Sequence, residues 1–102
     1  MRRGDVWLAE AGGKRRPVLV LTRGAVLDVR ALVTVAEITA SPRGLAVEVE
    51  LDHHAVGLER PSVVNADGLH TVAQTTLSTH VGALDGPTLS RVCAAIAYAL
   101  GC

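Results

Sequence analysis

Residues 12–21 read GGKRRPVLVL, in which three consecutive cations and a proline precede an unbroken aliphatic run. Four apolar residues in a row, bounded by polar sequence, are typical of a short buried strand. Pro17 fits the first position of such a strand, because its missing N–H breaks no ladder there. The stretch therefore predicts a strand over 17–22, with the densest positive cluster of the chain at its start.

Short apolar runs of the same kind fill the first 84 residues. The whole chain holds fifteen valines and thirteen leucines, and Gly, Pro, Asp and Arg separate the apolar runs, which is typical of a small closed sheet. Breaks at AGGK, RGAV, SPRG and DHHAVGLERP predict turns or loops. The predicted strands cover 5–10, 17–22, 31–37, 46–51, 62–66, 68–73 and 80–84.

The pattern changes after Asp85, which can cap a helix, and Gly101 can end it. No helical period precedes residue 85, so the sequence predicts a mainly β fold with one C-terminal amphipathic helix. At 102 residues we expect a single domain over 1–102. The apolar residues that recur at helical spacing are Leu89, Val92, Cys93, Ile96 and Leu100.

Charge is distributed unevenly along a chain whose ten basic and ten acidic residues cancel. Residues 1–30 hold seven cations against three acids, a local excess of +4, and the remainder carries the opposite −4. This asymmetry favours one face for an anion, with nucleic acid the first to consider, and a set of solvated surface arginines is the alternative.

Several other classes of function fit the sequence poorly. No apolar stretch approaches the roughly 20 residues of a membrane span, and MRRGDVW lacks the apolar run of a signal peptide, so we expect a soluble cytoplasmic protein. Cys93 and Cys102 match neither a disulfide framework nor a zinc spacing and are expected to be reduced thiols. Apolar surface left over on so small a sheet predicts a homodimer.

Metal and cofactor sites are also not predicted. Asp52, His53 and His54 are all ligand types, but neighbours on a strand point to opposite faces, which favours a solvated loop over a metal site. There is no G-x-S-x-G elbow, and neither of the glycine-rich phosphate-binding motifs occurs, so we expect no hydrolase triad and no nucleotide cofactor.

The remaining cluster combines Lys14, Arg15 and Arg16 with Thr39 and Ser41 of AEITASPRG, one strand away. An arginine presents a planar fork that matches phosphate oxygens, and a neighbouring hydroxyl adds a hydrogen bond to the same group. The cluster therefore predicts a phosphate cradle, and a surface cation beside a turn-forming Ser-Pro is the alternative.

Four blocks carry a resemblance to a known family: RGDVWLAE, RRPVLVLTR, VAEITAS and GLERPSVVNADGLHTV. In this order and spacing the sequence resembles the MazF/PemK family of bacterial toxins over essentially the whole chain. The resemblance implies an SH3-like barrel with a C-terminal helix, a homodimer, and a sequence-specific endoribonuclease that cuts single-stranded RNA without a metal or cofactor. It also implies a cognate MazE-like antitoxin, an acidic separate chain that neutralises the toxin.

The resemblance further implies which residues act. Arg16 and Thr39 match the catalytic pair of the family, in a reaction where the ribose 2′-OH attacks its own 3′ phosphorus to leave a 2′,3′-cyclic phosphate and a 5′-OH. Because a guanidinium is effectively always protonated, we predict His70 as general base, since imidazole titrates near neutral pH. Relatives commonly carry an arginine or another cation at the position of His70, and a histidine at the barrel rim with no role in the reaction is the alternative.

Asp67 matches a position where relatives often carry an acid, and is predicted to orient His70 or Arg16, with a turn residue as the alternative. Lys14, Arg15 and Ser41 are predicted to bind substrate. Trp7 is expected in the core. The alternative for the whole chain is an SH3-like module that binds nucleic acid or a peptide without cleaving it.

Overall fold

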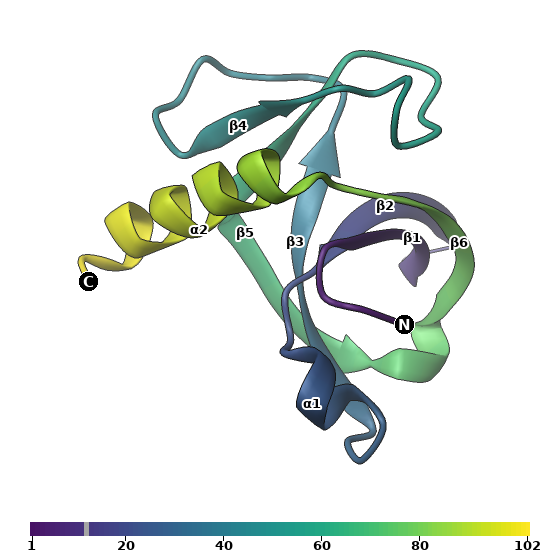
Figure 1. Cartoon of the computed structure of the whole chain (residues 1–102). Coiled ribbons are helices and arrows are strands. Elements are labelled where there is room, and N and C mark those ends of the chain that lie inside the picture. The colour runs from purple at the N-terminus through teal and green to yellow at the C-terminus, as the bar shows by residue number, and fades with distance from the viewer. Residues whose placement is uncertain (12) are drawn as a thin grey trace.

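The aliphatic run lies in the middle of a curled, six-stranded antiparallel sheet, with one long helix packed against it (Figure 1). The computed structural model describes residues 1–11 and 13–102, so part of the turn predicted at AGGK, Gly12, lies outside the described residues. The strand order is β4-β5-β3-β2-β1-β6. The elements are β1 (Asp5–Ala11), β2 (Lys14–Val20), α1 (Gly24–Leu27), β3 (Leu32–Thr39), β4 (Glu48–Leu51), β5 (Ser62–Ala73), η1 (Gln74–Thr76), β6 (Leu77–Ala83) and α2 (Gly86–Leu100).

Strand β2 is apolar on both faces because hydrophobic clusters cover both sides of the sheet. Val18 and Val20 pack into one cluster, and Leu19 packs into the other. Pro17 does not begin the strand as predicted, since β2 starts at Lys14. The pairing of β2 with β3 begins only at Val18, so one side of β2 is unpaired at the proline and its missing N–H is tolerated.

Helix α2 covers the cluster that contains Leu19, and its Val92 is fully buried there. The predicted caps are confirmed: Asp85 Oδ1 accepts the backbone N–H of Thr88 at 2.8 Å, and Gly101 adopts a left-handed φ of 74°. The hydroxyl and backbone N–H of Thr88 bond to the Asp85 carboxylate and lower its pKa below the ordinary value.

Further details differ from the predicted elements, such as β6, which begins at Leu77 rather than at residue 80. RGAV contributes to a short helix, α1, rather than a turn, and the buried side chain of Leu27 anchors it in the second cluster. A 3-10 turn, η1, also precedes residue 85. The two strands predicted over 62–66 and 68–73 are one continuous strand, β5. Strand β3 extends to Thr39, beyond the predicted end at Glu37.

The loop after β4 connects the two edges of the sheet. A side chain at Gly82 in β6 would collide with the backbone carbonyl of Val56, so the loop and β6 lie in close contact there. Val56 is itself buried in the cluster beneath α2. The mainly β fold with a C-terminal helix is thus confirmed, and this contact closes the curled sheet without a further strand pair. Within the described ranges, neither helix has the length and hydropathy needed to cross a bilayer.

Candidate active site

A groove of about 480 Å³ opens on the side of the sheet opposite to α2. Its floor includes Ala9, Val18 and Val35, which belong to the second hydrophobic cluster. An apolar floor beneath charged walls is a common design for a binding site. The polar residues that line the groove are Glu10, Arg16, Glu37, Thr39, Ser41, Arg43, Glu48, Asn65, His70 and Thr76.

Arg16 and Thr39 come to the groove from neighbouring strands. The pairing of β2 with β3 ends at Val18 and Glu37, and Arg16 and Thr39 each come two residues beyond this pair and line the groove. Arg16 is exposed, and Thr39 is half-buried. The Oγ1 of Thr39 accepts the backbone N–H of Ser41 at 3.1 Å, which leaves the hydroxyl proton free to be donated to a ligand.

His70 also lines the groove, and its partner is Glu37. The Nε2 of His70 lies 2.9 Å from Oε1 of Glu37, and each side chain is about half exposed, at 53% and 51%. Asp67, predicted to orient His70 or Arg16, is exposed and does not line the groove. Its backbone N–H donates to Oδ1 of Asn65 at 3.0 Å.

The loop between β3 and β4 brings Ser41 and Arg43 to the groove, and Glu48 holds this loop in place. The carboxylate of Glu48 accepts the backbone N–H of Arg43 at 3.0 Å and that of Leu45 at 2.9 Å. These hydrogen bonds, led by that of Leu45, lower the pKa of Glu48. Between them, Gly44 has a left-handed φ of 72°, which a residue with a side chain rarely adopts.

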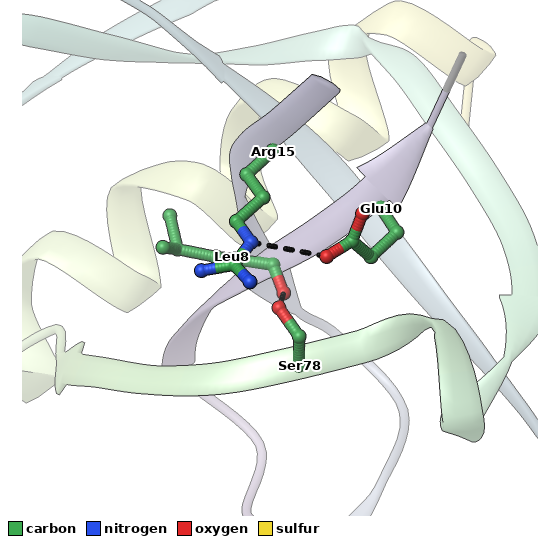
Figure 2. A network of polar contacts seen from close by, with 4 residues as sticks. All are labelled: Leu8, Glu10, Arg15 and Ser78. Atoms are coloured by element: carbon green, nitrogen blue, oxygen red, sulfur yellow. Dashed lines mark hydrogen bonds and ion pairs between the residues drawn. The ribbon is translucent and has the colours of Figure 1, made fainter. Parts of the chain in front are cut away.

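Lys14 and Arg15 lie beside the groove but do not line it. Both are exposed, in the part of β2 nearest the β1–β2 turn. Figure 2 shows the Arg15 guanidinium turned toward Glu10, with Nε 3.0 Å from Oε1, while Ser78 bonds to the carbonyl of Leu8 nearby. Because strand neighbours point to opposite faces, Arg15 and Arg16 lie on different sides of β2. The substrate-binding role of Lys14 and Arg15 stays a prediction.

The structure also shows where Trp7 and the pair His53 and His54 lie. Trp7, which was expected in the core, is only half-buried and packs against the second cluster, with its ring edge-on to His80 at 5.3 Å between centroids. The rings of His53 and His54 lie 4.0 Å apart in the loop after β4. No group of three or more potential metal ligands occurs within residues 1–11 and 13–102.

Sequence reasoning missed six polar groove residues: Glu10, Glu37, Arg43, Glu48, Asn65 and Thr76. A signal for Glu37 was present, because residues two apart on a strand share a face and Thr39 was already assigned. Arg43 carries no such signal, since its position depends on the path of the loop that Glu48 fixes.

Comparison with known proteins shows which family the chain belongs to. A family model described as the PemK-like, MazF-like toxin of type II toxin–antitoxin systems matches residues 2–100. The probable endoribonuclease MazF2 of Mycobacterium tuberculosis is 37% identical over 102 residues, covering 100% of both chains.

Solved structures agree with this match. The M. tuberculosis toxin MazF-mt6 superposes with a TM-score of 0.88 at 38% identity, covering 95% of this chain and 96% of that one. A mycobacterial endoribonuclease in complex with its cognate antitoxin gives a TM-score of 0.89 at 25% identity, covering 99% and 95%. The predicted resemblance is confirmed: the chain belongs to the PemK/MazF family of toxins of type II toxin–antitoxin systems.

Proposed function

We propose that this chain is the toxin of a type II toxin–antitoxin pair and acts as an endoribonuclease on single-stranded RNA, cutting at a specific sequence without a metal ion. Membership of a family whose relatives are named endoribonucleases supports the proposal. The observation that carries it is the shared groove, since Arg16, Thr39 and His70 line a single cavity of about 480 Å³.

The proposed reaction needs no nucleophile from the protein. The ribose 2′-oxygen attacks the adjacent phosphorus, the bond from phosphorus to the 5′-oxygen breaks, and the products are a 2′,3′-cyclic phosphate and a 5′-OH. One proton leaves the 2′-oxygen and one joins the 5′-oxygen, so the reaction is balanced without water or an added reactant. The protein supplies charge stabilisation and proton transfer.

Arg16 is the residue proposed to stabilise the charge that develops on the phosphoryl oxygens. A guanidinium matches two phosphate oxygens at once, and a cation already aimed at developing charge contributes several kcal/mol. Thr39 donates its hydroxyl proton to a non-bridging oxygen. His70 accepts the proton of the 2′-OH, because a neutral imidazole is the base best matched to neutral pH. Ser41 is proposed to bind the substrate next to Thr39.

We also infer the assembly in which the chain acts. The relative solved with its cognate antitoxin supports a separate antitoxin chain as partner. An acidic antitoxin segment would match the cations around the groove and compete with RNA. Exposed apolar side chains such as Val29, Leu32 and Tyr98 support a homodimer, in which such surface is covered. We propose that the single domain works in the cytoplasm.

The first prediction tests the proposed enzyme. Purified protein should cut a long single-stranded RNA in EDTA, and sequencing selective for 5′-hydroxyl ends should map the cuts to one short motif. Arg16→Ala should reduce kcat by roughly 100- to 1000-fold, the usual loss when one preorganised charge-stabilising donor is removed. The matched control is Arg23→Ala, an exposed arginine outside the groove, which should cut like the wild type.

Three outcomes would contradict the proposal or its catalytic residue. Cleavage that requires a divalent ion would exclude the metal-independent reaction. Binding of RNA with no cleavage by the wild type would favour the alternative, a non-catalytic SH3-like module. Full activity of Arg16→Ala, with unchanged circular dichroism, would mean that the catalytic arginine is misassigned.

A further inference from the structure

Glu37 lines the groove, and its carboxylate contacts His70. It comes two residues before Thr39 on β3, so both side chains share a face, and its pairing partner on β5 is Asn65. The Oε1 of Glu37 is 2.9 Å from Nε2 of His70, within the range of a strong hydrogen bond. Sequence reasoning had assigned no role to this acid.

An irregularity in the sheet makes this contact possible. Across β3 and β5, Ala36 lies opposite Leu69 but Glu37 lies opposite Asn65, so residues 66–68 are extra on β5. Gly68, within this bulge, packs directly on the Glu37 side chain. A Cβ at Gly68 would lie 2.9 Å from the carboxyl carbon of Glu37, closer than real Cβ contacts allow. The glycine therefore leaves the space that the carboxylate occupies.

The other glutamates of the groove are directed elsewhere. Glu10 pairs with Arg15, and Glu48 accepts the backbone N–H groups of the loop between β3 and β4. Among the groove glutamates, Glu37 is the one whose carboxylate contacts His70 in the described part of the chain. The bulge in β5 and the missing side chain of Gly68 thus leave room for the Glu37 carboxylate, which contacts Nε2 of His70.

We propose that Glu37 is a positioning residue that fixes the tautomer of His70, with the proton on Nε2 and the lone pair on Nδ1. An ionised carboxylate only accepts hydrogen bonds, so a neutral imidazole must donate Nε2–H to it. The Nδ1 lone pair is then the acceptor for the 2′-OH proton. The role of Nδ1 in catalysis rests on the proposed function. The tautomer of His70, by contrast, is a property of the free protein.

The test of the tautomer is nitrogen NMR of the ¹⁵N-labelled full chain, at a pH high enough to keep the imidazole neutral. His70→Gln identifies the signals of His70 among the four histidines. The expected wild-type pattern is a protonated, pyrrole-type Nε2 and an unprotonated, pyridine-type Nδ1. In Glu37→Gln, the amide can either accept or donate, so a mixture of both tautomers is expected.

Two further variants sharpen this test. Gly68→Ala keeps Glu37 but displaces its carboxylate, so it should give the same mixture of tautomers. Glu50→Gln changes an exposed glutamate on β4 outside the groove and should leave the His70 signals unchanged. A wild-type His70 protonated on Nδ1, or a pattern that Glu37→Gln does not alter, would overturn the proposal whatever the activity of the enzyme.

The kinetic test asks whether Glu37 acts through His70. Glu37→Gln should lower kcat by roughly tenfold or more with KM unchanged, because general-base catalysis is worth about 10²- to 10⁴-fold. In the His70→Gln background the same substitution should have no further effect. An equal loss in both backgrounds would indicate a merely structural role and would reject the proposal.

The result for His70→Gln alone separates this inference from the proposed nuclease. Unchanged kcat in that variant would remove His70 as base and reject the role of Glu37, while cleavage that depends on Arg16 would stand. Absence of any RNA cleavage by the wild type would instead reject the proposed function, and the NMR pattern would still decide whether Glu37 sets the tautomer.

Discussion

Thr39 has two hydrogen-bonding roles for one hydroxyl group. Its oxygen accepts the N–H of Ser41 and so shapes the first turn of the loop between β3 and β4. Its proton remains available for a phosphate oxygen. A serine in its place would retain both roles, whereas a valine of similar shape would lose both.

The two roles of the Thr39 hydroxyl give a testable prediction. Thr39→Val should lower kcat/KM by roughly ten- to hundredfold, since hydrogen bonds to charged groups contribute about 1.5–3 kcal/mol. Thr39→Ser should keep most of the activity, and Thr79→Val, an exposed threonine of β6, serves as control. Cleavage assays of the three variants decide the point: equal activity of Thr39→Val and Thr39→Ser would mean that the hydroxyl does not contact the reacting group.

Helix α2 shows how an element depends on its N-cap residue, Asp85. The Asp85 carboxylate bonds to Thr88, and this contact holds the pKa of Asp85 below the ordinary 3.8. A group with a lowered pKa in the folded state adds stability above its ordinary pKa. That stability is lost as the pH falls through the lowered value.

We therefore expect Asp85→Ala to lower the melting temperature at pH 7, with a smaller decrease once the pH is well below 3.8. Asp85→Asn keeps a capping oxygen and should be closer to the wild type at pH 7. Thermal unfolding followed by circular dichroism measures all three proteins at each pH. A decrease for Asp85→Ala that is independent of pH would show that the charge of the cap does not contribute.

The elements also show what sequence could and could not predict. Helix α2 was predictable because fifteen residues display a clear period between two recognisable caps. Helix α1 has four residues, too few for any period, and forms because Leu27 is buried in the core. The predicted strands over 62–66 and 68–73 left out Asp67, whereas in the folded chain residues 66–68 form a bulge within one strand.

The same reasoning applies to the candidate site. The resemblance and the sequence order pointed to Arg16, Thr39, Ser41 and His70, and all four line the groove. Asp67, three residues before His70, was predicted to orient His70 or Arg16 or to be a turn residue, whereas the carboxylate that contacts His70 is that of Glu37 on another strand. Such pairs depend on strand register, and the register here shifts at a bulge that no sequence pattern marked.

For the whole molecule, the distribution of charge matters more than the net charge of zero. The excess of +4 lies in residues 1–30, which supply β1, β2 and the wall of the groove that holds Arg16. Lys14 and Arg15 lie beyond the groove on the same hairpin, where they would meet RNA that extends past the cut site. They should therefore affect binding rather than chemistry.

Salt dependence can separate these two effects. For single strands, each phosphate contact contributes about 0.7 to the slope of log K against log salt. With an RNA methylated at its 2′-hydroxyls, which cannot be cut, Lys14→Gln should reduce the slope by about 0.7. Arg15→Gln should reduce the slope by less, because Glu10 already partly neutralises Arg15.

Both variants should cut saturating RNA at the wild-type kcat. The control is Arg60→Gln, which changes an arginine in an exposed loop outside the groove. Unchanged slopes for Lys14→Gln and Arg15→Gln would mean that RNA does not follow the hairpin, and a decrease in kcat would instead place these cations at the scissile phosphate.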